Sequence, residues 1–415
     1  MLNSIKSKLG ELFNNSLINL EGTGKLSYND KNYEINWLLN FSISNRLIIL
    51  IESDIPLRLT DNQNYFLEYN LKGTTNDKQW HINTDNLIIY SMNFKISNEN
   101  SKYRYECKAY DVIIEHFTNT QIYNSINVYI NNFIFKGLEL SKYDNEFKVD
   151  KMSFDFNNRK YTIKQIENYD KILELLNNNI IDNAATSIMS FDLNDSEKID
   201  DTIEEVELLT WLLCLTSLNY NFFSMYKLYL NNEVKCIKIY GNTKHAKLIN
   251  TVLIDNFKIN AGIKNFIEKC YEKFKELYYD TFDIKMLISW LLEMEQQKTI
   301  ELKIVLLIIS LEYALSNFLL KNNIINQDQI LKIHIVDKLR KANNILQFIP
   351  KELLDNFIKD KIRNPLFHQG AIPFITFEEK NKFIYQYFDL LIKIIYKILG
   401  YNGSFINKNN ELINI

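Results

Sequence analysis

The pattern of apolar and polar residues changes its period once along the chain, near Asn260. Before that point, from about Gly22 to Tyr161, short runs such as Tyr33–Ile43 and Arg46–Ser53 alternate apolar with polar positions. These runs are rich in aromatic and β-branched residues, and such alternation is typical of strands with one buried face. Polar turn residues separate them at fairly regular spacing. The region therefore predicts an antiparallel β-sandwich or barrel.

After Asn260 the apolar positions recur with the period of an α-helix. The pattern predicts helices over residues 261–278, 284–295, 299–321, 329–345, 351–362 and 377–399. Their dense Ile, Leu and Phe faces favour an antiparallel bundle. Pro350, Pro365 and Pro373 are expected at joints between helices, because proline interrupts a helix interior.

Between these two regions the sequence predicts a small α/β segment. It has a helix over 167–181, an Asn- and Asp-rich loop to residue 201, an apolar helix over 202–218 and two strands around the turn at Asn231. We therefore expect an α+β protein in three parts. These are an N-terminal antiparallel β-rich domain (1–165), an α/β connector (166–260) and a C-terminal all-α helical bundle (261–415).

The candidate chemistry lies in Ile362–Gly370, which reads I-R-N-P-L-F-H-Q-G and contains an Arg-Asn-x-x-x-His pattern. Arg363 supplies a permanent cation, and His is the side chain type whose ordinary pKa lies near neutral pH. Such a pair suits phosphate chemistry, because a guanidinium can bind phosphoryl oxygens while an imidazole transfers a proton. A structural alternative stays open, in which Arg363 pairs with an acid and His368 caps a helix or packs.

Local rules suggest how these side chains are presented. Because Pro365 suits the first turn of a helix, Asn364 is expected to cap a new helix, with His368 one turn along on the same face. Arg363 would then lie just outside a helix start whose free amides favour an anion. Glu312 is the one acid in the apolar run Leu306–Asn317. A buried carboxylate needs a partner, so Arg363 or His368 is expected to pair with it unless it faces solvent.

Charge and composition modify this picture only slightly. The net charge of −3 argues against non-specific coating of nucleic acid by the whole protein. Residues 331–363, however, hold eight Lys and Arg against four Asp and Glu, a net charge of +4 that favours a phosphate-bearing ligand. The four Cys are far apart and lack zinc-ligand spacing, which predicts buried thiols in a reducing cytoplasm.

Two further segments were weighed for other functions. Gly22–Lys25 reads GTGK, but it lacks the earlier Gly and the following Ser or Thr of a P-loop, so we expect a turn. Residues 1–13 predict a short amphipathic helix, and the longest apolar run, at residues 304–309, is too short to cross a bilayer. The sequence therefore predicts no membrane association, no metal site and no cofactor.

Three matched segments resemble the HEPN domains of the ApeA type, which occur in bacterial abortive-infection proteins. They are Leu311–Glu312, Ile362–His368 and Leu399–Gly403, within a resemblance over about residues 280–405. The one departure is Gln369, because many members have Gly directly after the His. The β-rich half is compatible with the sensor-like region that precedes HEPN in this group.

The resemblance implies a metal-independent endoribonuclease without cofactor, in which Arg and His face each other across a two-fold homodimer. His368 would act as general base or acid for attack of the RNA 2′-hydroxyl, Arg363 would hold the phosphate and Asn364 would orient the pair. It also implies a toxin of anti-phage defence, with tRNA as one candidate substrate, a phage-derived trigger and scope for higher oligomers. The alternative is a non-catalytic HEPN module for nucleotide or RNA binding or for oligomerisation.

Overall fold

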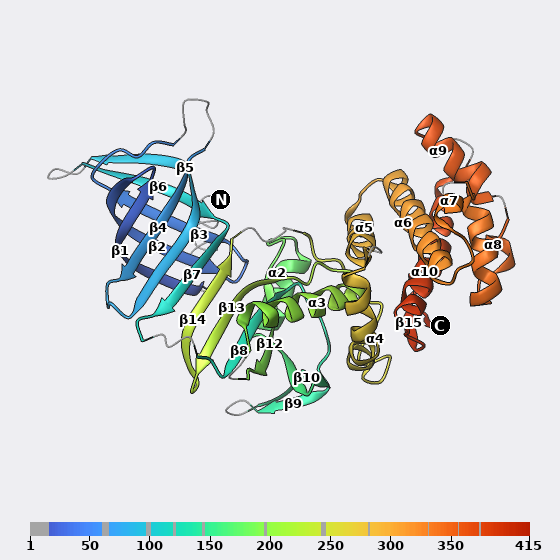
Figure 1. The fold of residues 1–415 in the computed structure, drawn as a ribbon, viewed down its shortest axis with the longest axis horizontal. Coiled ribbons are helices and arrows are strands. Elements are labelled where there is room, and N and C mark those ends of the chain that lie inside the picture. The colour runs from blue at the N-terminus through green and yellow to red at the C-terminus, as the bar shows by residue number, and fades with distance from the viewer. Residues whose placement is uncertain are drawn as a thin grey trace. The chain divides into compact units, whose positions relative to one another are not determined.

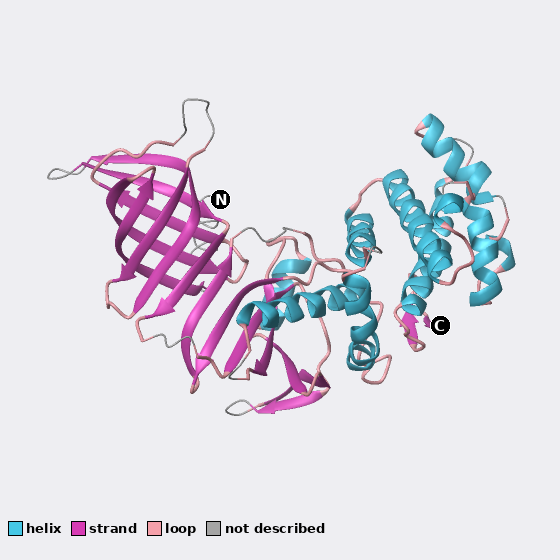
Figure 2. Cartoon of the chain, in the orientation of Figure 1, coloured by secondary structure: helices cyan, strands magenta, loops and turns pink. Residues whose placement is uncertain are grey.

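The computed structural model describes residues 16–59, 66–96, 101–118, 122–142, 146–194, 197–241, 246–280, 283–330, 332–355, 357–372 and 375–415. The expected N-terminal helix and Pro373 lie outside these ranges. Within them the protein combines a large antiparallel sheet with a series of C-terminal helices (Figures 1 and 2). The prediction of a mixed α and β fold with an antiparallel β-rich N-terminal half is confirmed.

The first six strands close into a barrel. They are β1 (Ser16–Tyr28), β2 (Lys31–Ser42), β3 (Leu47–Ser53), β4 (Glu68–Thr75), β5 (Trp80–Ile96) and β6 (Ser101–Ala109). The pairings run in the order β4-β1-β2-β3-β6-β5, and β5 pairs with β4 again, so the ring has no free edge. Alternate side chains, among them Trp37, Phe41, Tyr69 and Tyr105, fill a continuous apolar core. The barrel, one of the two architectures predicted for residues 22–161, is confirmed for β1 to β6, whereas the predicted strands after residue 110 lie outside it.

The GTGK segment lies inside strand β1, so the expectation of a turn is wrong. Glycines in β1 and in the neighbouring strand β4 allow the strands to approach closely. A Cβ on Gly22 would lie 2.0 Å from the carbonyl oxygen of Thr74, and a Cβ on Gly73 would lie 2.3 Å from Trp37 Nε1. The Trp37 indole needs that space, because its N–H donates to the carbonyl of Thr23 over 3.1 Å.

The sheet continues beyond the barrel. The order after β5 is β7 (Asp111–His116), β14 (Glu233–Tyr240), β13 (Phe223–Leu230), β8 (Ser125–Asn131), β12 (Ala185–Asp192), β11 (Arg159–Gln165), β10 (Phe147–Phe156) and β9 (Glu139–Lys142). Both strands predicted for the connector thus belong to this sheet, since β14 pairs with β7 and β13 with β8. The expected loop before residue 201 contains strand β12, which the sequence analysis missed. Helix α2 (Tyr169–Asn177) lies within the predicted 167–181.

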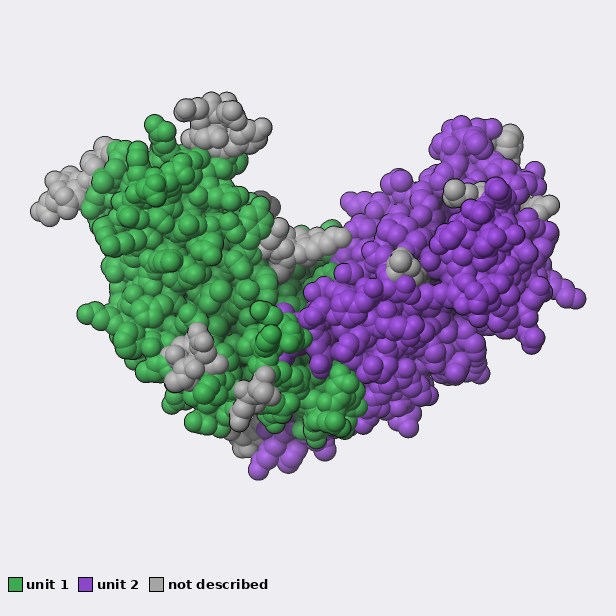
Figure 3. Space-filling view, viewed as in Figure 1, with its two compact units in different colours: residues 1–134, 150–201, 222–248 green, residues 135–149, 202–221, 249–415 purple. Residues whose placement is uncertain are grey.

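The chain forms two compact units, coloured separately in Figure 3. Unit 1 comprises residues 1–134, 150–201 and 222–248, and unit 2 comprises 135–149, 202–221 and 249–415. The residues expected in a connector are divided between them. Helix α3 (Ile199–Ser217), predicted from residue 202, lies mostly in unit 2.

The helices of unit 2 after α3 follow the sequence prediction closely. They are α4 (Gly262–Tyr278), α5 (Ile284–Gln296), α6 (Ile300–Lys321), α7 (Gln327–Ile330), α8 (Ile335–Leu346), the 3-10 turn η1 (Lys351–Leu353), the π-helix η2 (Ile358–Arg363), α9 (Asn364–Gln369) and α10 (Phe377–Ile398). A hairpin of β15 (Ser404–Ile406) and β16 (Leu412–Asn414) follows. The segment predicted over 329–345 divides into α7 and α8, and that over 351–362 becomes η1 and most of η2.

Helix α6 is central to unit 2 and packs against α5, α8 and α10. Although the apolar run at 304–309 is short, α6 as a whole is long and apolar enough to cross a membrane by length and composition. Within the protein, 56% of its most apolar stretch is buried. A core helix has this pattern, so α6 by itself is weak evidence for a membrane span.

Candidate functional site

The Arg-Asn-x-x-x-His motif lies within one continuous helical segment formed by η2 and α9. Asn364 has helical torsions, φ −62° and ψ −49°, and its amide donates to the carbonyl of Lys359, five residues earlier. Asn364 is therefore not an N-cap. The prediction that a helix with unpaired N-terminal amides begins beside Arg363 is wrong. Pro365 explains the difference, because it lacks an amide and its ring would clash with the carbonyl four residues earlier in an α-helix. The wider π-turn relieves both problems.

Arg363 pairs with Glu312 on the facing helix α6. The Nε group donates to Glu312 Oε1 over 2.8 Å, and the side chains are 33% and 27% exposed. The guanidinium also lies over the ring of Phe367, 5.4 Å from its centre. Of the two partners predicted for Glu312, Arg363 and His368, the structure shows Arg363. The same pair also fits the structural alternative, in which Arg363 pairs with an acid. Within the described ranges Glu312 is the only hydrogen-bonding partner of this guanidinium, so both Nη groups remain available to an anion.

His368 and Asn364 lie one turn apart on α9, as the spacing predicted. His368 is exposed and Asn364 is half-buried. The imidazole has no hydrogen-bond partner among the described residues. In an α-helix a separation of five residues turns side chains about 140° apart. Arg363 and His368 of one chain therefore face different directions.

A buried lysine that the sequence analysis did not single out completes the group. Lys338 on α8 is 5% exposed, and its Nζ donates to Ser316 Oγ over 2.9 Å. The Ser316 hydroxyl in turn donates to the carbonyl of Glu312 over 2.6 Å. Lys338 occupies the apolar stripe of α8 together with Ile335 and Leu339, and this position is the signal that could have revealed it.

The electrostatics of the group follow from two cations and one carboxylate. Burial lowers the pKa of Lys338 below its usual value, while the Glu312 carboxylate raises this pKa and the Arg363 guanidinium lowers it. The three charges therefore act on one another, and their sum is +1. We call Glu312, Ser316, Lys338 and Arg363 the α6–α8 charge cluster.

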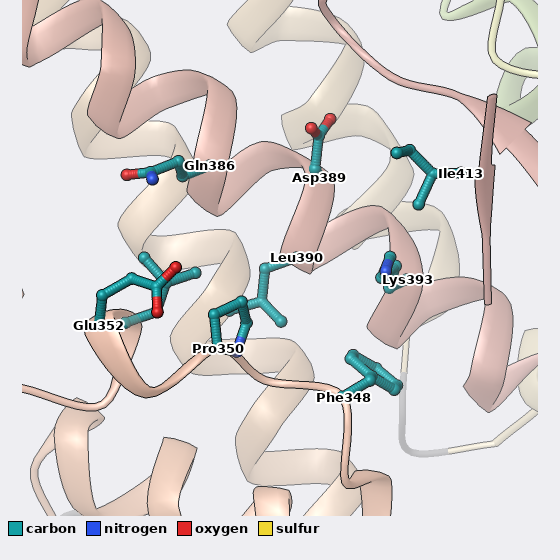
Figure 4. Close-up of a pocket in the computed structure, with 9 residues that line it drawn as sticks. Phe348, Pro350, Glu352, Gln386, Asp389, Leu390, Lys393 and Ile413 are labelled. Atoms are coloured by element: carbon teal, nitrogen blue, oxygen red, sulfur yellow. The ribbon is translucent and has the colours of Figure 1, made fainter. Parts of the chain in front are cut away.

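A separate cavity of about 190 Å³ lies between α10, the η1 segment and β16 (Figure 4). Its apolar lining is Phe348, Pro350, Leu353, Leu390 and Ile413, and its polar lining is Glu352, Gln386, Asp389 and Lys393. Burial raises the pKa of Asp389 to about 6. None of the motif residues lines this cavity, and no sequence pattern pointed to it.

All four cysteines of the chain are buried and free, as predicted, and burial raises the pKa of each thiol. Among the described residues no three His, Cys, Asp or Glu side chains are grouped so that they could hold a metal ion. No protein-family model matches the chain, and no characterised protein or solved structure is significantly similar to it. The candidate site therefore has to be interpreted from its own chemistry.

Proposed function

We propose that this protein is a metal-independent endoribonuclease whose C-terminal helices form a HEPN-type domain. The observation that carries the proposal is the state of Arg363. Its Nε is fixed by Glu312 while its Nη groups have no other partner in the described chain, and the exposed His368 follows on the same helical segment. The free Nη groups present a fork of donors to an arriving anion, the geometry that suits phosphate oxygens.

The proposed reaction is an internal transesterification of RNA. His368 removes the proton of a 2′-hydroxyl, and the 2′-oxygen attacks the adjacent phosphorus. The bond from phosphorus to the 5′-oxygen breaks, and the leaving oxygen takes up a proton, which yields a 2′,3′-cyclic phosphate and a 5′-hydroxyl. Arg363 binds the non-bridging oxygens as their charge grows, and Asn364 orients the substrate or the imidazole. DNA has no 2′-hydroxyl and is not cut.

A composite site between two chains is part of the proposal. Because Arg363 and His368 of one chain point about 140° apart, one phosphate cannot easily engage both. A two-fold axis beside α9 would bring Arg363 of one protomer toward His368 of its partner. Phe367, which is 47% exposed between them, supplies apolar surface for such a contact.

The direct test incubates the full chain with total RNA in the presence of a metal chelator. We expect cleavage, a cyclic phosphate at the new 3′ end, and no cleavage of DNA. His368→Ala and Arg363→Ala should each lower the rate by at least about a hundredfold. His334→Ala is the matched control, because His334 is also exposed in unit 2 but lies outside the motif.

Equal cleavage by wild type and His368→Ala would exclude the proposed chemistry. Tight RNA or nucleotide binding without turnover would instead favour a non-catalytic binding module. For the biological setting we propose a cytoplasmic toxin that becomes active in infected bacteria and cleaves RNA. One candidate substrate is tRNA. Induced expression should then arrest growth with wild type but not with His368→Ala.

A further inference from the structure

The α6–α8 charge cluster holds an unusual surplus of buried positive charge. Lys338 is almost fully buried, yet its one side-chain hydrogen bond within the described residues is to the neutral hydroxyl of Ser316. The Glu312 carboxylate, which would neutralise it, is already hydrogen-bonded to Arg363. A buried ammonium without a hydrogen-bonded anion lowers the stability of the folded state, so a purely structural role does not explain Lys338.

The connections within the cluster show how the two cations are coupled. Ser316 lies one turn after Glu312 on α6, and its hydroxyl links Lys338 to the Glu312 backbone through bonds of 2.9 and 2.6 Å. Lys338 thus lies on the Glu312 face of α6. If Arg363 turns away from Glu312 toward an anion, Lys338 is the cation of the cluster that remains on this face.

We propose that Lys338 is a positioning residue that releases Arg363 to a phosphate group by serving as the standing counter-ion of Glu312. In the free protein Glu312 holds Arg363 in place. When a phosphate arrives, the guanidinium exchanges the carboxylate for phosphate oxygens, and the Lys338 ammonium remains to balance the charge of Glu312. This inference rests on the proposed function, because it takes Arg363 as the phosphate ligand.

The cluster predicts a specific pattern of coupling between substitutions. Lys338→Met keeps the volume and apolar stem of the side chain but leaves Arg363 as the sole cation for Glu312. Glu312 then holds Arg363 more tightly, and phosphate affinity should fall about tenfold. Glu312→Gln removes the competitor, so adding Lys338→Met to Glu312→Gln should change phosphate affinity by less than about twofold. Lys338→Arg keeps the charge and should restore most of the affinity.

The experiment measures binding of inorganic phosphate to the full chain by titration calorimetry or phosphorus NMR. Lys382→Met is the control, because Lys382 is an exposed cation of α10 outside the cluster. A tenfold loss with Lys338→Met that disappears in the Glu312→Gln background supports the inference. An equal loss of phosphate affinity in the wild-type and Glu312→Gln backgrounds would mean that Lys338 attracts the anion directly. A loss no larger than that caused by Lys382→Met would mean that Lys338 acts only through the overall charge of the protein. Either result overturns the inference, as does the absence of phosphate binding by the wild type.

This measurement separates the inference from the nuclease proposal. If the effect of Lys338→Met on phosphate affinity depends on Glu312 but the protein does not cleave RNA, the role of Lys338 stands and the endoribonuclease proposal is wrong. If RNA cleavage depends on Arg363 and His368 but the effects of Lys338→Met and Glu312→Gln on phosphate affinity are independent, the endoribonuclease stands and the role of Lys338 is wrong. Thermal unfolding of each variant checks the fold, and Lys338→Met should be no less stable than wild type, because replacing a buried charge by an apolar side chain is often stabilising.

Discussion

Substitution of Glu312 by Gln tests the charge balance of the cluster through folding stability. The change keeps the shape of the side chain and removes its charge from between Arg363 and Lys338. Two unit charges about 4 Å apart interact by about 4 kcal/mol at an effective dielectric constant of about 20. Because the pair is 33% and 27% exposed, solvent screening and desolvation reduce this to about 1 kcal/mol. Loss of the weaker attraction between Glu312 and Lys338 adds up to about 1 kcal/mol, so we expect a total loss of about 1–2 kcal/mol.

Urea unfolding of the full chain measures this loss, and hydrogen exchange of peptides from α6 and η2 locates it. The control is Glu276→Gln, which removes the exposed ion pair with Lys273 in the same unit and should cost less than about 0.5 kcal/mol. In a Lys338→Met background the loss from Glu312→Gln should shrink toward 1 kcal/mol, because only one cation remains. If Glu312→Gln costs no more than Glu276→Gln, the account of the cluster is refuted.

Three further substitutions probe other parts of the molecule. Because the pKa of Asp389 is raised to about 6, the folded state binds its proton more tightly than the unfolded state, and stability falls as pH rises through this range. Asp389→Asn should therefore gain about 1 kcal/mol at about pH 7.5, after allowance for partial exposure, and little below about pH 4, as measured by denaturation across pH. Pro365→Ala restores an amide donor and should let the π-turn relax to an α-helix, which rotates Arg363 by about 100°. We then expect RNA cleavage to fall at least about tenfold, while circular dichroism shows that the helix is retained. Gly73→Ala should destabilise the barrel by about 1–3 kcal/mol and perturb Trp37 fluorescence, because its new methyl group collides with the indole; an unchanged spectrum and stability would contradict the packing described.

The long helices could be predicted from the sequence because their signals are local. Helices α4, α5, α6 and α10 begin and end within one residue of the predicted bounds. Helices α4, α5 and α10 have an apolar stripe at helical spacing, α6 is apolar along most of its length, and α10 also has a Thr376–Glu379 capping box. The alternation in the N-terminal half likewise predicted strands, but the choice of a barrel depends on the pairing of β4 with β5, which no local pattern specifies.

The remaining features depend on tertiary context. Strand β12 was missed because Ala, Ser and Thr occupy several of its buried positions, so its apolar signal is weak. Strands β13 and β14 were placed in a connector because sequence adjacency says nothing about pairing with β7 and β8. At the site, the residue types Arg363, His368 and Glu312 could be selected from the sequence. The approach of Lys338 could not, since it arises from packing between α6 and α8. The π-turn has a local cause in Pro365, but a proline is equally compatible with the first turn of a new helix, which is what was expected.

The claim that two chains form one composite ribonuclease site is tested most directly by mixing the two inactive variants. Arg363→Ala and His368→Ala are purified separately, mixed in equal amounts, allowed to exchange subunits and assayed on RNA. A mixed dimer then holds one site with both Arg363 and His368, so random exchange should restore about a quarter of the wild-type activity. If the mixture stays as inactive as its components although mixed dimers are present, the composite site is contradicted.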